Sequence, residues 1–127
     1  MLINLSNHPS DNWEEDQKKA AAPYGAIYDV VFPVIDPTAT SREVESLADS
    51  YAYKVAQLLS GQNEPASAVH LMGELTFCFA LVARLQKAGI ICIASTTRRE
   101  TVVHPDGSKT SRFGFVRFRE YSLLTPM

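Results

Sequence analysis

A chain of 127 residues with 46% hydrophobic and 20% charged residues has the composition of a globular protein, which excludes a disordered chain. This length predicts one domain over residues 1–127, with a core large enough to fold without a disulfide or a structural metal. The formal net charge of −2 argues against a surface that coats duplex nucleic acid and leaves room only for a local basic pocket.

The first half of the chain predicts two strands, each followed by a helix. Residues 2–5 are typical of a short buried strand, and the next helix is expected to contain Trp13. Trp13 is expected in the core, the alternative being that it stacks on a base at the rim of the pocket. The expected limits of that helix are Ser10 or Asp11 at its start and Pro23 or Gly25 at its end. Residues 26–32 predict a second strand. Ser41 is expected to cap a long amphipathic helix that Gly61 ends.

The second half of the chain continues the alternation and closes with a hairpin. Residues 68–72 predict a third strand, and residues 75–87 a helix that is apolar on nearly every face. Such a helix lies in the core or is covered by a partner subunit. Residues 90–94 are a continuous apolar run, typical of a parallel strand buried on both faces. Residues 105–108 predict a hairpin turn, and residues 113–121 complete the sheet.

This element order predicts an α/β fold: a three-layer, Rossmann-like domain with a mainly parallel sheet and a C-terminal β-hairpin. Cys78 and Cys92 lie in apolar runs outside any C-x-x-C pair, which indicates buried, reduced thiols. The chain shows no signal peptide, and no apolar stretch approaches the ~20 residues of a membrane span. We therefore expect a cytoplasmic protein without membrane contact.

Ligands of open α/β sheets bind outside the carboxyl ends of the strands. Four segments are expected to meet there, namely residues 6–8, 32–33, 73–76 and 95–99. Gly73 permits close backbone approach, and the free N–H groups at the start of the following helix favour an anion near Glu74 and Thr76. The alternative is that Gly73 only makes the turn and Thr76 helps to cap the helix.

Two further candidate groups lie at these strand ends. Thr96, Thr97, Arg98 and Arg99 supply hydroxyl and guanidinium donors that suit a phosphate, unless one arginine pairs with Glu74 or Glu100 and the other is solvated. His8 is a candidate general acid or base, or else a simple hydrogen-bonding residue of the turn.

The other two histidines and the possible metal-ligating residues indicate no further site. His70 and His104 are expected to be structural. No grouping has the spacing of metal ligands, so neither a metal nor another cofactor is expected.

The chain resembles a known family over most of its length: small CRISPR-associated accessory proteins of CARF-like Rossmann fold, regarded as ring nucleases of cyclic oligoadenylate. The resemblance is carried by Leu5-Ser6-Asn7-His8 before an acidic helix that reaches Gln17, Gly73-Glu74, Ala94-Ser95-Thr96-Thr97-Arg98, Asp106-Gly107 and Phe115-Val116-Arg117-Phe118-Arg119-Glu120-Tyr121.

The resemblance implies a homodimer that binds cyclic oligoadenylate and cleaves it without a metal, by attack of a ribose 2′-OH on the neighbouring phosphate. It makes His8, Ser6 and Arg98 the catalytic candidates. The implied ligand-binding residues are Asn7, Gly73, Glu74, Thr76, Thr96, Thr97 and Arg99. Two alternatives stay open: a module of the same fold that only binds or sequesters the nucleotide, and an unrelated Rossmann-like protein that binds another phosphorylated ligand.

Overall fold

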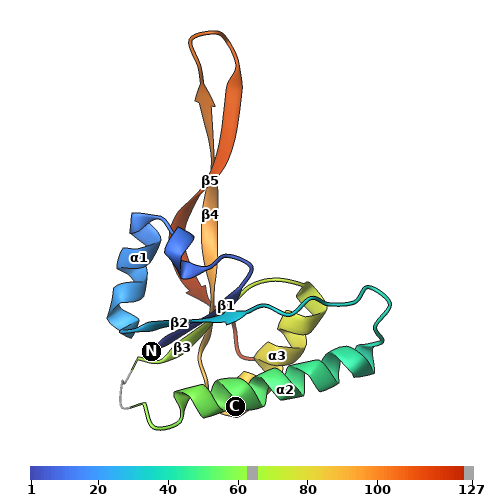
Figure 1. Cartoon of the computed structure of the whole chain (residues 1–127). Helices are drawn as coiled ribbons and strands as arrows, with labels where there is room; N and C mark the ends of the chain where they lie inside the picture. Colours follow the sequence, from blue (N-terminus) through green and yellow to red (C-terminus); the bar gives the residue numbers. More distant parts are fainter. Residues whose placement is uncertain (63–65, 125–127) are drawn as a thin grey trace.

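The protein is an α/β structure built on one five-stranded sheet, seen in a computed structural model that describes residues 1–62 and 66–124 (Figure 1). The strand order is β2-β1-β3-β4-β5. The first four strands run parallel, and β5 runs antiparallel to β4. The strands are β1 (Leu2–Ser6), β2 (Ile27–Val31), β3 (Ala68–Leu71), β4 (Cys92–Val103) and β5 (Lys109–Glu120).

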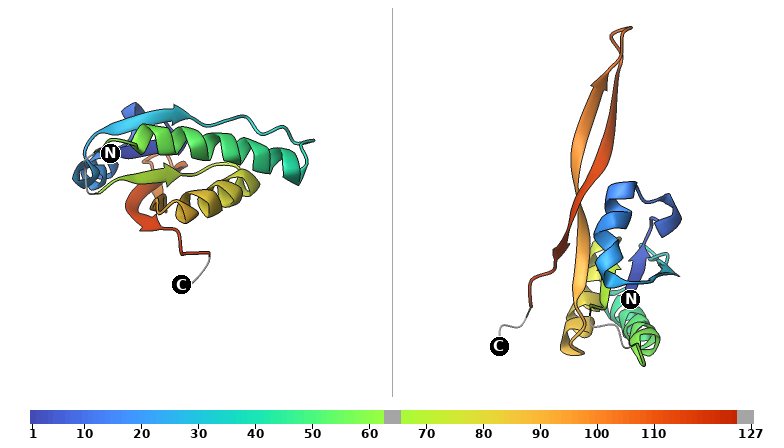
Figure 2. Two further views of the ribbon diagram at one scale, coloured as in Figure 1. Left: turned by 90° about the horizontal axis from the view of Figure 1, so that it is seen from below. Right: turned by 90° about the vertical axis from the view of Figure 1, so that its left-hand side faces the viewer.

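Helices cover both faces of this sheet. On one face α1 (Glu15–Ala21) lies between two short 3₁₀ helices, η1 (Ser10–Asn12) and η2 (Ala22–Tyr24). The other face carries α2 (Ser41–Leu59) and α3 (Leu75–Lys87), which pack against each other (Figures 1 and 2). This arrangement confirms the expected α/β architecture and is compatible with a Rossmann-like fold.

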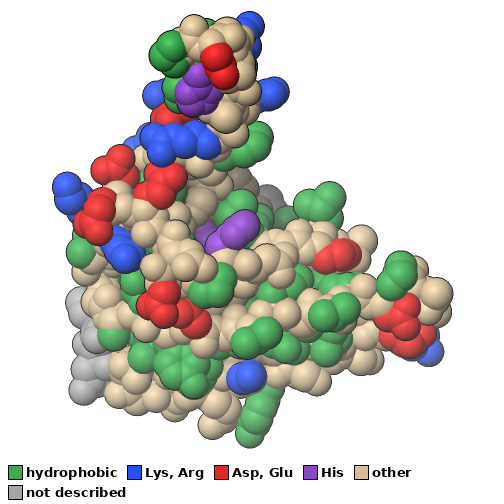
Figure 3. All heavy atoms as spheres, turned by 45° about the horizontal axis from the view of Figure 1, so that its top comes forward, with side chains coloured by type: hydrophobic (Ala, Val, Ile, Leu, Met, Phe, Trp, Pro, Cys, Tyr) green, Lys and Arg blue, Asp and Glu red, His purple; other side chains and the backbone are tan. Residues whose placement is uncertain are grey.

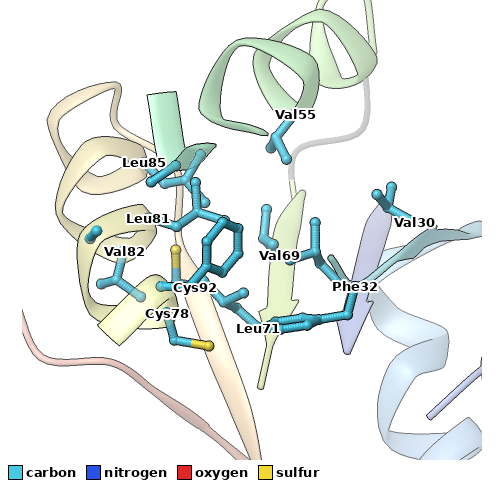
Figure 4. Close-up of a cluster of buried hydrophobic side chains, with 14 of the residues drawn as sticks. Val30, Phe32, Val55, Val69, Leu71, Cys78, Leu81, Val82, Leu85 and Cys92 are labelled. Carbon is cyan, nitrogen blue, oxygen red and sulfur yellow. The ribbon is translucent and has the colours of Figure 1, made fainter. Parts of the chain in front are cut away.

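The alternation of side chains along β1 explains the two layers. Ile3 and Leu5 belong to the larger core under α2 and α3, whereas Leu2 belongs to a smaller cluster under α1. Figure 4 shows part of the larger core, where side chains from both helices meet the sheet. Phe77 is fully buried there, and its ring contacts the rings of Phe32 and Tyr51 edge-on at centroid distances of 5.3 and 5.5 Å.

The structure confirms several burial predictions. Trp13 is a core residue, and both cysteines are buried as free thiols. The hairpin turn lies where it was expected, because the His104 carbonyl accepts a hydrogen bond from Gly107 N, and Gly107 has a φ of 85°. In the described part of the chain, no helix combines the length and the apolar character that a membrane span requires.

The helix predictions need two corrections at their N-terminal ends. Trp13 lies outside a helix, because its backbone and that of Glu14 are extended between η1 and α1. This break lets the indole ring turn toward the sheet, where it lies 5.3 Å from the His70 ring. Thr40, and not Ser41, caps α2, in a capping box that it forms with Glu43.

The fourth strand is much longer than the predicted residues 90–94. It continues to Val103, and β5 pairs with it over its whole length, with a β-bulge between Thr96 and Thr97. The two strands of an antiparallel hairpin form hydrogen bonds with each other, so the hairpin can continue beyond the end of β3. Its outer part, residues 97–115, projects far beyond the other strands (Figures 1 and 2). We call this part the arm.

Candidate functional site

The strand order reverses between β1 and β3, and this is the point where ligands of open α/β sheets bind. The connection that leaves β1 runs to the α1 face, and the connection that leaves β3 runs to the α3 face. A cavity of about 190 Å³ opens next to this point, at the carboxyl ends of β1 and β2. Its lining includes Asn4, Ser6, Asn7 and Asp29.

A row of polar side chains, buried at its centre in Asn4 and His70, crosses the sheet beside this cavity on the α1 face. Asn4 Nδ2 donates to Asp29 Oδ1 at 2.8 Å, and Asn4 Oδ1 lies 2.9 Å from His70 Nδ1. His70 Nε2 lies 2.7 Å from Ser95 Oγ, which also accepts a hydrogen bond of 3.1 Å from Gln17 Nε2. The row therefore joins four neighbouring strands to α1.

The partners in this row assign its protons. The nitrogen of the Asn4 amide lies next to the Asp29 carboxylate and the His8 carbonyl, and both of these groups are acceptors. The other end of the amide, which faces His70, is therefore the oxygen Oδ1, and it accepts a hydrogen bond. His70 Nδ1 must then carry the proton, and His70 Nε2 accepts from the Ser95 hydroxyl. Burial, and next the charge of His8, lower the pKa of His70 from 6.5 to about 4. His70 is therefore neutral at pH 7 and structural, as expected.

The turn after β1 holds the backbone of His8 firmly while leaving its imidazole exposed. Two side-chain donors converge on the His8 carbonyl, Asn4 Nδ2 at 2.9 Å and Trp13 Nε1 at 3.1 Å. Within the described residues, the imidazole itself makes no hydrogen bond. A side chain that is both anchored at its backbone and accessible is well placed for proton exchange with a ligand.

The other candidates in this turn differ in accessibility. Ser6 is buried, and its hydroxyl contacts Asn4 Oδ1 at 2.8 Å and His8 N at 3.2 Å. These contacts give Ser6 a role in holding the turn. Asn7 is exposed and borders the cavity.

The junction between β3 and α3 is capped by a side chain of the chain itself, although the N-cap residue is Glu74 and not Thr76. The Glu74 carboxylate accepts hydrogen bonds from Phe77 N at 3.0 Å and from both the backbone N–H and the hydroxyl of Thr76. Hydrogen bonds from the Thr76 side chain, and then from the backbone, lower the pKa of Glu74. The chain's own carboxylate thus occupies the helix N-terminus that a phosphate would need.

Gly73 has a packing reason of its own. A Cβ atom at this position would lie 2.2–2.7 Å from three ring atoms of Phe32, closer than any real contact. The glycine therefore makes room for the end of the β2 segment against the end of β3.

The Thr96-Thr97-Arg98-Arg99 group was expected directly after the fourth strand, and this expectation is wrong because the group lies inside β4. Successive side chains of a strand point to opposite faces, so Arg98 and Arg99 do not share a pocket. Thr96 Oγ1 bonds the backbone of Arg117 at the β-bulge, with 3.0 Å to its carbonyl.

The arginines of β4 also differ in their partners. Arg99 Nη2 lies 3.4 Å from Ser111 Oγ. Glu100 pairs with Arg112 at 2.9 Å, so neither Arg98 nor Arg99 takes it as a partner. Among the described residues the Arg98 side chain has no hydrogen-bond or ion-pair partner, and it remains available to an anion.

The polar row was missed in the sequence, although a signal for its buried centre exists. In β1 the polar residues Asn4 and Ser6 alternate with Ile3 and Leu5, and all four are buried. Two polar positions on one face of a fully buried strand indicate partners on that face. His70 lies in register with Asn4 on the neighbouring strand and is that partner.

Fold and site together define an α/β protein with a mostly parallel sheet, an antiparallel C-terminal hairpin and a polar carboxyl edge at its strand-order reversal. Residues 1–119 match the model of the Uncharacterized protein MJ1673 family, so the chain belongs to that family. No curated protein and no solved structure matches the chain.

Proposed function

We propose that the protein is a CARF-like, metal-independent ring nuclease that binds and cleaves cyclic oligoadenylate in CRISPR antiviral signalling in the cytoplasm. The ligand class comes from the family resemblance of the sequence. The structural observation that carries the proposal is the anchored, exposed His8 at the strand-order reversal. General acid–base catalysis requires a titratable group that is fixed in position and accessible, and the His8 imidazole meets both conditions.

The reaction needs no atom from outside the ligand. The 2′ oxygen of one ribose forms a bond to the adjacent phosphorus while the bond from phosphorus to the 5′ oxygen breaks. His8 would take the proton of the 2′ hydroxyl, and the leaving 5′ oxygen would gain a proton from water or from His8. Arg98 would stabilise the charge on the phosphoryl oxygens. The product is a linear strand with a 2′,3′-cyclic phosphate and a 5′ hydroxyl.

The size of the site favours a ligand shared between two copies. The 190 Å³ cavity is smaller than the roughly 300–1,000 Å³ typical of sites for drug-sized ligands, so a cyclic oligonucleotide must extend beyond it. A ring with twofold symmetry would lie across a twofold homodimer, with Asn7 of each copy near its edge.

The direct test is incubation of the full chain with cyclic tri-, tetra- and hexa-adenylate in EDTA, followed by mass spectrometry of the products. We expect linear products with 2′,3′-cyclic phosphate ends and at least about a 100-fold loss of rate in His8→Ala. His104→Ala is the matched control, because His104 lies beside the hairpin turn and bonds Thr110. Intact ligand after prolonged incubation with stoichiometric protein would overturn the proposal.

One observation favours the second candidate, a module that binds the nucleotide without cleaving it. At the carboxyl ends of β1, β2 and β3, the described carboxylates Asp29 and Glu74 are both engaged in hydrogen bonds, which leaves His8 as the single free proton carrier there. Tight calorimetric binding without turnover, weakened by Arg98→Ala, selects this function. Failure to bind any cyclic oligoadenylate selects an unrelated Rossmann-like protein with another phosphorylated ligand.

A further inference from the structure

The arm exposes apolar side chains without any layer to cover them. Val103 and Phe113 are 64% and 68% exposed on one face of the ribbon, and Val102 is 48% exposed on the other. A two-stranded ribbon is marginally stable in water by itself. Large apolar side chains exposed on both faces of such a ribbon favour a partner molecule that covers them.

Charge separates the arm from the rest of the chain. The arm holds four basic and two acidic residues, which gives it a formal charge of +2 within a chain of −2, so the remainder carries −4. Figure 3 shows the Lys and Arg side chains along the arm. The charged arm residues are Arg98, Arg99, Glu100, Asp106, Lys109 and Arg112. Opposite charges on the arm and the body favour contact between the arm of one copy and the body of another.

The body offers a groove of complementary character. A groove of about 990 Å³ runs along α3, bounded by the β2–α2 connection, the start of α2 and residues 121–124. Leu75 and Phe79 lie in it, 83% and 66% exposed. Its acidic residues include Asp36 and Glu45, whereas Arg84, a basic residue in the groove, is paired with Asp49.

We propose that the arm of one copy docks in the α3 groove of a second copy, with the contact made twice in a twofold dimer. The exposed apolar residues of the arm would cover Leu75 and Phe79, and basic residues of the arm other than Arg98 would face Asp36 and Glu45. The arm points away from α2 and α3 of its own chain (Figure 1), so the contact joins two chains. The inference rests on these surfaces alone and does not require the ligand proposed above.

A nucleic acid is the other partner that a basic ribbon suggests, and the arm fits it less well. Its net charge is only +2, and Arg112 is already paired with Glu100. Nucleic-acid affinity comes largely from many unpaired cations, whereas the arm combines few cations with exposed valine and phenylalanine.

The first experiment measures the mass of the full chain by light scattering and sedimentation over a range of concentrations. We expect a dimer whose dissociation constant rises at least about tenfold in Phe79→Glu and in Phe113→Ser. Tyr53→Ser is the matched control, because Tyr53 is 70% exposed on α2 and lies outside the groove. Circular dichroism checks that each variant keeps the fold. A monomer at all concentrations, or a dimer that neither variant weakens, overturns the proposal.

The second experiment is specific to an arm-in-groove contact. Phe79→Glu keeps an intact arm and Phe113→Ser keeps an intact groove, so a mixture of the two restores one of the two contacts. Native mass spectrometry should find the mixed dimer at a concentration where each variant alone is monomeric.

If the two arms contact each other instead, mixing the variants does not restore the dimer. Failure to find the mixed dimer therefore overturns the proposal. Unchanged mass with reduced binding of single-stranded RNA in Phe113→Ser also overturns it, in favour of a nucleic-acid partner. Both experiments measure the mass of the protein and not its activity. A negative result in them therefore overturns the docking proposal without bearing on the proposed ring-nuclease function.

Discussion

His70 is tightly constrained, because both ring nitrogens are hydrogen-bonded and the residue is only 2% exposed. Removing the ring would take one of two donors from Asn4 Oδ1 and the acceptor from the Ser95 hydroxyl proton, and an unmet hydrogen bond of this kind commonly costs about 1–3 kcal/mol.

The first prediction concerns pH. The pKa of His70 is about 4 in the folded chain and near 6.5 in the unfolded chain, so the unfolded state binds the proton first as pH falls. The stabilisation is complete above pH 6.5 and declines as pH falls toward 4. We expect a loss of about 2 kcal/mol in unfolding free energy between pH 7.5 and 5, measured by urea denaturation. The dependence should be much weaker in His70→Gln; an equal dependence would exclude His70 as its source.

The second prediction concerns Gly73 and Phe32. Gly73→Ala should destabilise the chain by roughly 1–3 kcal/mol, because the new Cβ would overlap the Phe32 ring. Phe32→Leu removes the overlapping ring, so the double variant should lose clearly less than the sum of the two single variants. A double-mutant cycle by chemical denaturation measures this coupling. Simple additivity would mean that the backbone moves to admit the methyl group.

Among the elements, α3 is fixed from its first turn. Its start is held by the Glu74 carboxylate, and its buried side chains, Phe77 and Leu81 among them, fill the core under the sheet. Leu75 and Phe79, on the outward side, remain exposed. The near-uniform apolar pattern of this helix therefore has two causes, core packing and an uncovered groove.

The third prediction follows from this cap. Glu74→Ala removes the acceptor for the Thr76 and Phe77 N–H groups, and we expect the Tm to fall by about 4 °C. Glu74→Ser should retain most of the wild-type Tm, because serine is a favoured N-cap residue. Thermal melts followed by circular dichroism compare the two variants. Equal melting temperatures for the alanine and serine variants would show that capping is not the role of Glu74.

At the scale of the whole molecule, the body and the arm differ in what supports them. β1 and β3 are buried between two helical layers, whereas the arm is a ribbon whose outer hydrogen-bonding edges are unpaired. A dimer of the kind proposed would give the arm the cover that its own chain lacks.

The fourth prediction compares hydrogen exchange in these two parts. At high dilution, arm amides should exchange far faster than those of β1 and β3, because the arm opens locally. At concentrations that favour the dimer, arm protection should rise, and it should not rise in Phe79→Glu. Exchange followed by mass spectrometry measures both. Protection of the arm that is equal at all concentrations would show that the ribbon is stable alone.

The sequence by itself determined the elements whose signals are local. Apolar runs predicted β1 and β3, the limits of α3 were predicted to the residue, and Gly107 marked the hairpin turn. The position of the candidate site followed from the parallel order, because the carboxyl ends of parallel strands lie together. His8 was placed at that edge from its position after the first strand.

Only the tertiary structure decided which polar groups meet. The Asn4–His70–Ser95–Gln17 row joins residues far apart in the chain, and strand register, which depends on the packing of both faces, sets their distances. Arg98 and Arg99 lie on opposite faces because β4 continues past the other parallel strands. This continuation depends on the pairing of β4 with β5. Local sequence sets propensity and burial pattern, whereas contacts between distant strands arise only when the whole sheet assembles.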